Sequence, residues 1–138
     1  MSDAEAHPAE VLAILKEKSA RTRIAVVGAS NNPEKYGHII VQNLKRKGYT
    51  VLPVNPRERT IAGLVAYPSL KEIEGPIHIV NIVTPPAVTR RVLEEVAALG
   101  LPNVWLQDGS FDDEVLAYAA SAPFRTVHHA CIMVVSSQ

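Results

Sequence analysis

The segment IAVVGASNNPEKYG, residues 24–37, constrains the fold more than any other stretch of this chain. Its first four residues are all apolar, which is typical of a strand that is buried on both faces. Gly28 follows directly, and a glycine permits a sharp backbone turn that a side chain would obstruct. The segment therefore predicts a βα unit, in which a buried strand leads through a tight turn into a helix.

We expect the helix after this turn to begin at residues 31–33. Asn31 and Asn32 are favoured N-cap residues, and Pro33 suits the first helical position because its missing N–H costs nothing there. The unpaired N–H groups of the first turn, together with the helix dipole, would face an anion. The alternative is an ordinary βα turn without a ligand. We favour the anion site, because a glycine, a serine and a capped helix start all follow the first strand.

Segments of strand and helix type alternate along the chain. We expect strands at residues 24–27, 49–54, 77–83, 103–107 and 125–129, a short edge strand within 61–67, and helices in the intervening segments. Such alternation, with short connections, implies parallel strands with helices on both faces. The predicted fold class is α/β, a Rossmann-like doubly wound parallel sheet. We expect a single domain over residues 1–138, with an extra N-terminal helix that starts at Pro8 and a flexible tail over residues 1–7.

Charge and composition limit the partners. The chain carries 14 basic and 14 acidic side chains, and this zero net charge argues against nucleic acid as the main partner. No apolar run approaches the roughly 18 residues that span a bilayer. Cys131 is the only cysteine, which suits a reducing compartment. We therefore expect a cytoplasmic monomer or homodimer without a membrane partner, and a larger protein partner stays open.

Ligands of doubly wound sheets bind at the carboxyl ends of the strands, near the switch in strand order. The dinucleotide fingerprint G-x-G-x-x-G is absent after the first strand, because Pro33 stands where the third glycine would be. The second strand ends in Asn55, where an NAD site usually has an acid for the ribose. Both departures argue against NAD.

Two arginines follow the second strand. Arg57 and Arg59 lie where a cation would suit a phosphorylated ribose, which NADP and coenzyme A both carry. The residues alone do not separate these two ligands. An equally good interpretation is a solvated loop in which the arginines pair with Glu58.

Five segments resemble the small stand-alone CoA-binding domain proteins, which are related to the CoA-binding domain of the succinyl-CoA synthetase alpha subunit and of ADP-forming acyl-CoA synthetases. The segments fall in this order within residues 23–131: VVGASNNPEKYG, YTVLPVNP, IAGLVAYPSL, VNIVTPP and NVWLQDGS. The resemblance implies a Rossmann-like fold and the binding of coenzyme A. No reaction is established for the stand-alone members of that family.

The resemblance also implies which residues bind CoA. The phosphates would be contacted by Gly28, Ala29, Ser30, Lys35, Tyr36 and Gly37. The nucleotide and the start of the pantetheine arm would be flanked by Val54, Asn55, Pro56, Val83, Thr84 and Pro85. Arg57 joins this set as the cation beside the ribose, and Gln107 joins it because a strand end opens into the cleft. The chain departs from the family at Ala130, where members commonly have an arginine before the cysteine.

His128, His129 and Cys131 are the remaining candidates for chemistry. Neighbouring residues of a strand point to opposite faces, so we expect His128 and His129 not to converge on a metal. We expect Cys131 to be a buried free thiol, because a catalytic thiol needs a base and an orienting group. We therefore assign no metal ligand and no catalytic residue.

The function that we favour is the binding of CoA or an acyl-CoA by a module that is not an enzyme on its own. The first alternative is an enzyme, either an NADP-dependent oxidoreductase or a CoA-dependent transferase. The second is a CoA-binding subunit of a larger acyl-CoA synthetase-like assembly. The phosphohistidine of synthetase chemistry lies outside the CoA-binding domain, so a partner chain would have to supply it.

Overall fold

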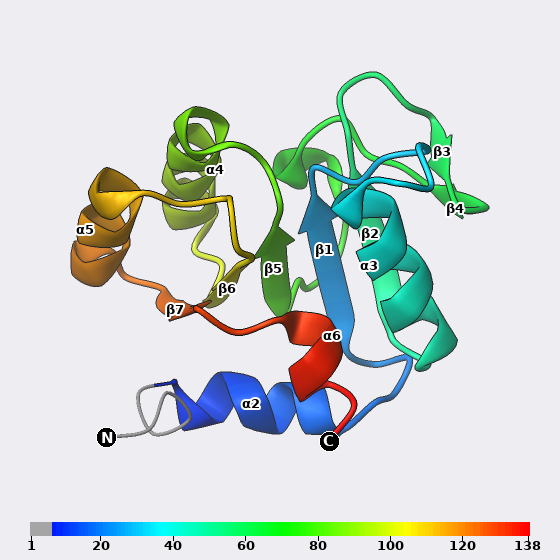
Figure 1. The fold of residues 1–138 in the computed structure, drawn as a ribbon, viewed down its shortest axis with the longest axis horizontal. Coiled ribbons are helices and arrows are strands. Elements are labelled where there is room, and N and C mark those ends of the chain that lie inside the picture. The colour runs from blue at the N-terminus through cyan, green and yellow to red at the C-terminus, as the bar shows by residue number, and fades with distance from the viewer. Residues whose placement is uncertain (1–6) are drawn as a thin grey trace.

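A five-stranded parallel sheet forms the centre of the computed structural model, which describes residues 7–138 (Figure 1). The strands are β1 (Arg23–Val27), β2 (Thr50–Val54), β5 (Ile79–Ile82), β6 (Asn103–Leu106) and β7 (Arg125–His128). Their order is β2-β1-β5-β6-β7, so the chain changes direction across the sheet between β1 and β5. The predicted Rossmann-like α/β fold is confirmed. Of the tail expected at residues 1–7, only His7 falls within the described residues.

Helices cover both faces of the sheet, as the alternation predicts. They are α2 (Ala9–Lys16), α3 (Tyr36–Arg46), α4 (Pro86–Leu99), α5 (Asp113–Ser121) and α6 (Ile132–Val135). Along β1, Ile24 and Val26 pack in the core beneath α2, α3 and α6, whereas Ala25 and Val27 pack beneath α4 and α5. This division explains the unbroken apolar run of β1, because both of its faces are buried. None of the described helices is long and apolar enough to cross a membrane.

The connection from β2 to β5 contains no α-helix. It consists of a small antiparallel hairpin, β3 (Thr60–Ile61) with β4 (Leu64–Val65), and one 3-10 turn, η1 (Leu70–Glu72). The sequence indicated a short edge strand within residues 61–67. The edge pairing occurs only at Tyr67, which forms a parallel bridge with Val54 of β2, whereas β3 and β4 pair with each other. A full helix therefore does not cover this part of the sheet, and space remains between η1 and α4.

The helix after β1 begins later than its sequence signals indicate. The predicted N-cap at residues 31–33 is wrong, because α3 begins at Tyr36 with Lys35 as its N-cap residue. The side-chain amide of Asn31 donates instead to the main-chain carbonyl of Thr60, at 2.8 Å. A partner far along the chain thus draws the asparagine away from the helix start.

Asn81 is a polar residue within the core. It lies on β5 in register with Val26 of β1 and Trp105 of β6, and it is completely buried. Neither its side-chain oxygen nor its side-chain nitrogen has a hydrogen-bond partner among the described residues. A buried polar group without a partner costs about 1–3 kcal/mol.

We predict that Asn81→Val raises the free energy of unfolding by about 1–3 kcal/mol, because it removes the unpaired amide and valine suits a buried strand. Urea denaturation measures this difference. Asn103→Val is the matched control, because the Asn103 amide donates to the carbonyl of His78 at 2.8 Å and its loss should destabilise the fold. A destabilised Asn81→Val protein would contradict this account of the core.

Candidate functional site

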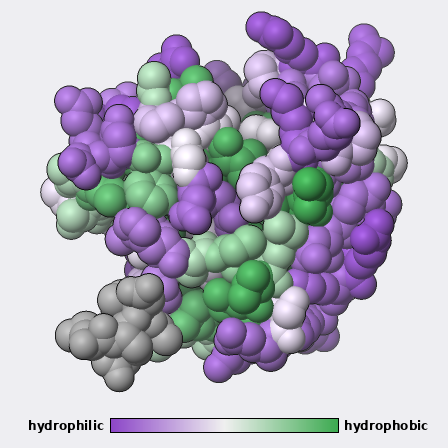
Figure 2. Space-filling model, in the orientation of Figure 1, coloured by the Kyte–Doolittle hydropathy of each residue, from purple (hydrophilic) through white to green (hydrophobic). Residues whose placement is uncertain are grey.

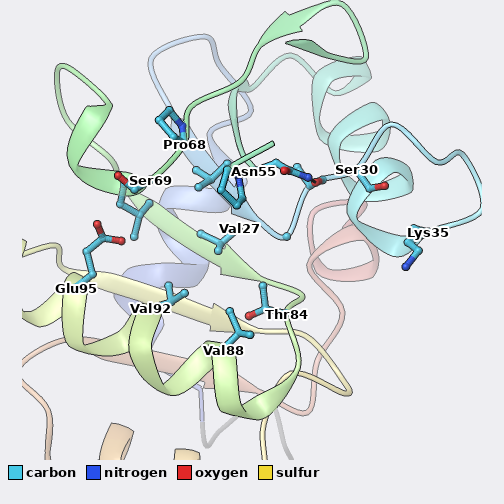
Figure 3. Close-up of a pocket in the computed structure, with 15 residues that line it drawn as sticks. Val27, Ser30, Lys35, Asn55, Pro68, Ser69, Thr84, Val88, Val92 and Glu95 are labelled. Carbon is cyan, nitrogen blue, oxygen red and sulfur yellow. Dashed lines mark hydrogen bonds between the residues drawn. The ribbon is translucent and has the colours of Figure 1, made fainter. Parts of the chain in front are cut away.

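A pocket of about 390 Å³ opens at the carboxyl ends of β1 and β2, between η1 and α4 (Figure 3). It lies beside the change of direction between β1 and β5, where doubly wound sheets bind their ligands. Its walls are formed by Val27, Gly28, Ala29, Ser30, Lys35, Val54, Asn55, Pro56, Pro68, Ser69, Leu70, Thr84, Val88, Val92 and Glu95.

The structure brings eight of the fourteen sequence-predicted site residues together in this pocket. They are Gly28, Ala29, Ser30, Lys35, Val54, Asn55, Pro56 and Thr84. The other six do not line it: Tyr36, Gly37, Arg57, Val83, Pro85 and Gln107. Two of these six, Gly37 and Val83, pack against the turn at Gly28 without lining the pocket.

The turn at Gly28 is shaped by Gly37 and Val83. Gly28 has a φ of +93°, and a Cβ atom at this position would lie 2.7 Å from Cγ2 of Val83. A Cβ atom at Gly37 would lie only 2.1 Å from the carbonyl oxygen of Gly28. The first turn of α3 therefore rests directly on the turn after β1. Glycine is needed at position 28 for its left-handed conformation and at position 37 for this close approach.

Side chains hold the carbonyl groups of the following loop. The amide nitrogen of Asn55 donates to the carbonyl of Ala29 at 2.9 Å. Nδ1 of His38 lies 2.9 Å from the carbonyl oxygen of Ser30. The loop is thus held in shape from β2 on one side and from α3 on the other. Asn55 was among the site residues expected from the sequence, whereas His38 was not.

The pocket has an apolar middle and two polar ends of opposite charge. Lys35 lies at one end, Ser69 and Glu95 lie at the other, and valines from β1 and α4 lie between them (Figure 3). The sequence analysis missed the part that η1 and α4 contribute. Val88 and Val92 carry the apolar helical spacing of α4, but that spacing does not distinguish a face on the sheet from a face on a pocket.

A second hollow, of about 380 Å³, adjoins the first. Arg57, Glu58 and Arg59 line it, and it shares Pro56 and Pro68 with the main pocket. The ion pairs among residues 7–138 are Arg90–Glu94 and Arg125–Glu10, so neither arginine of this loop pairs with Glu58. Both guanidinium groups are exposed beside the main pocket.

Gln107 follows β6 and packs against the start of α6. Helix α6 covers the face of the sheet opposite to the one that α4 covers, so Gln107 does not line the pocket. It is only 5% exposed, its Oε1 accepts the N–H of Ile132 at 2.9 Å, and its Nε2 donates to Sγ of Cys131 at 3.5 Å. It thus fastens the start of α6. Cys131 is half-buried, so the expectation of a fully buried thiol is met only in part.

Tyr36 begins α3 and does not line the pocket. The residue is 59% exposed, and Ile39 and Val134 are two further large apolar residues exposed on α3 and α6. Apolar residues gather over α6 on the face of the molecule shown in Figure 2.

The prediction that His128 and His129 cannot converge is wrong. Their Nδ1 atoms lie 2.6 Å apart, and the ring of Phe111 packs edge-on against both. The strand ends at His128, and His129 adopts a left-handed φ of +58°, which turns its ring back onto its neighbour. Within residues 7–138, no cluster of three or more histidine, cysteine or acidic residues could hold a metal ion.

Burial lowers the pKa of His128 below its ordinary value, and the positive charges of His129 and His7 lower it further. The unfolded chain therefore binds more protons than the folded chain between this lowered pKa and the unfolded value of about 6.5. Stability should fall as the pH drops through that range.

We predict that His128→Gln loses less stability than the parent protein when the pH falls from about 7.5 to about 5.5. The variant has no imidazole at this position to protonate on unfolding. Urea denaturation of both proteins at the two pH values measures the difference. An equal loss of stability in both proteins would mean that His128 does not contribute to the acid sensitivity.

A family model described as "CoA binding domain" matches residues 22–137. Uncharacterized protein YneT of Bacillus subtilis is 34% identical over 126 residues, which are 91% of this chain and 91% of YneT. The alpha subunit of acetate–CoA ligase [ADP-forming] II from Pyrococcus furiosus is 40% identical over 91 residues. Those residues are 65% of this chain but only 20% of that subunit.

Solved structures with the same fold include two small archaeal proteins. A conserved hypothetical protein from Pyrococcus furiosus superimposes with a TM-score of 0.79 at 39% identity, over 82% of this chain and 97% of that protein. A hypothetical protein from Pyrococcus horikoshii OT3 gives a TM-score of 0.82 at 30% identity, over 99% and 91% of the two chains. The fold is therefore shared along nearly the whole length of both small proteins.

Proposed function

The chain belongs to the CoA-binding domain family, and we propose on that basis that it binds coenzyme A in the pocket between η1 and α4. One observation carries the proposal: the turn at Gly28, which has no side chain, and the basic residue Lys35 line the same pocket. A diphosphate requires close approach to main-chain N–H groups and a neighbouring cation. The start of α3 supplies both requirements.

In the proposed complex, the diphosphate lies against residues 28–30, next to the first turn of α3. The N–H groups of Tyr36 and Gly37 belong to that turn and carry the positive end of the helix dipole. This arrangement gives Tyr36 and Gly37 a role through their main chain, although their side-chain positions do not line the pocket.

The phosphorylated ribose would lie at the end of β2. Asn55 and Pro56 line the pocket there, and Arg57 and Arg59 flank the adjoining hollow. Exposed guanidinium groups that are not paired with Glu58 are free to bind a phosphate group. The 3′-phosphate that coenzyme A carries on its ribose suits this position.

The pantetheine arm would leave the diphosphate over residues 83–85. Val83 and Thr84 approach the turn at Gly28 closely, so an arm that starts at the diphosphate passes them first. From there the arm would run towards β6 and the start of α6. Gln107 would then act by fastening α6 beside this path.

We propose a binding role without a reaction of its own. The described residues that line the pocket include only two with ionisable side chains, Lys35 and Glu95, and these lie at opposite ends. General acid–base catalysis needs groups within hydrogen-bonding distance of the reacting atoms. A pair that is separated by the length of the pocket does not supply this arrangement.

A second candidate is a CoA-binding component of an acyl-CoA synthetase-like assembly. The identity of 40% with an ADP-forming acetate–CoA ligase alpha subunit favours it. This chain spans about a fifth of that subunit, so a partner chain would have to supply the catalytic residues. The same pocket would hold CoA in both cases.

We predict that Lys35→Ala weakens CoA binding about ten- to hundredfold, because a charge-assisted contact to phosphate contributes about 1.5–3 kcal/mol. Isothermal titration calorimetry measures the affinity. Lys16→Ala removes the same charge from the last turn of α2, away from the pocket, and should bind CoA like the parent protein. Equal affinities in all three proteins would remove Lys35 from the site.

A further inference from the structure

The opposite charges at the two ends of the pocket would orient a bound nucleotide. Lys35 and the glycine turn lie at one end, whereas Glu95 and Ser69 lie at the other (Figure 3). A carboxylate repels phosphate, so the diphosphate of a bound nucleotide belongs at the Lys35 end. The chemistry of the Glu95 end must suit a different part of the ligand.

Glu95 faces the pocket because of its position on α4. Val88, Val92 and Glu95 are spaced four and then three residues apart, so they share one face of the helix. The neighbouring Glu94 points elsewhere and pairs with Arg90 at 3.6 Å. Neither of the two ion pairs within residues 7–138 involves Glu95, so its carboxylate faces the pocket without a cationic partner.

We infer that Glu95 accepts a hydrogen bond from the exocyclic amino group of adenine and thereby selects the nucleobase. This inference rests on the proposed function and adds a specificity-determining residue to it. The valines and Leu70 offer apolar surfaces to the faces of a flat ring. At the ring edge, adenine presents an N–H donor and a neighbouring ring-nitrogen acceptor. The carboxylate of Glu95 and the hydroxyl of Ser69 complement this pair.

The rival occupant of this end is the pantetheine arm or an acyl chain. An acyl chain would bury the Glu95 carboxylate without a donor, and burying an unpaired charge is costly. The amino group of adenine removes this cost. The pantetheine arm does carry amide N–H donors, so experiment must separate it from adenine. The two occupants also differ in a measurable way, because ADP contains adenine and the diphosphate but no pantetheine.

The test compares ADP with inosine 5′-diphosphate, which presents a carbonyl where adenine presents its amino group. We expect the parent protein to bind ADP at least about tenfold more tightly, because a carbonyl oxygen facing a carboxylate leaves both acceptors unpaired. Glu95→Gln should reduce this preference to about threefold or less, because an amide can also donate to the carbonyl. Glu94→Gln removes the same charge one residue away and should keep the parent preference. Calorimetric titration of the three proteins gives the ratios.

The inference is overturned if Glu95→Gln keeps the parent ratio, or if it weakens CoA while ADP binding is unchanged, which would put the pantetheine arm at this end. In both cases CoA would still bind, so the proposed function would stand. If the parent protein binds neither CoA nor ADP, the proposed function and the inference fail together. A ratio that changes in Glu95→Gln and not in Glu94→Gln supports the nucleobase role and is not explained by a general loss of stability.

Discussion

The close contact between the first turn of α3 and the turn after β1 is the constraint on which the site depends. The carbonyl of Gly28 occupies the space in which a side chain at Gly37 would lie, so two glycines define how the helix meets the strand. This contact brings the positive end of α3 to the carboxyl edge of the sheet without side chains in between. Asn55 and His38 then hold the next two carbonyl groups, so side chains from β2's end and from α3 stabilise the shape of the loop.

The pocket exists because the crossover from β2 to β5 is thin. A hairpin and one 3-10 turn stand where a doubly wound fold more often has a full helix, and the uncovered space lies between η1 and α4. The face of α4 near that space carries valines and then Glu95, whereas the opposite end of the pocket carries Lys35. The fold therefore provides an apolar slot with opposite charges at its two ends, which suits a ligand that has a base at one end and phosphates at the other.

Much of the fold and about half of the pocket could be predicted from the sequence. Strand and helix periodicities are local properties, and so is the glycine turn, which is why the parallel sheet and the sharp turn at Gly28 could be predicted. The remaining features depend on long-range partners. Asn31 bonds to Thr60 instead of capping a helix, and His129 leaves the strand to meet His128. The apolar spacing of α4 could be recognised in the sequence. The absence of a full helix between β2 and β5, which leaves part of this apolar face exposed to a pocket, could not.

We propose that this member of the CoA-binding domain family uses the pocket for coenzyme A. Native mass spectrometry of the protein, mixed with equal concentrations of CoA and NADP, tests this claim most directly. The account predicts a saturable complex with one CoA per chain and little NADP bound, because the first turn lacks the dinucleotide fingerprint. A complex with NADP in preference to CoA, or no complex with either ligand, would contradict it.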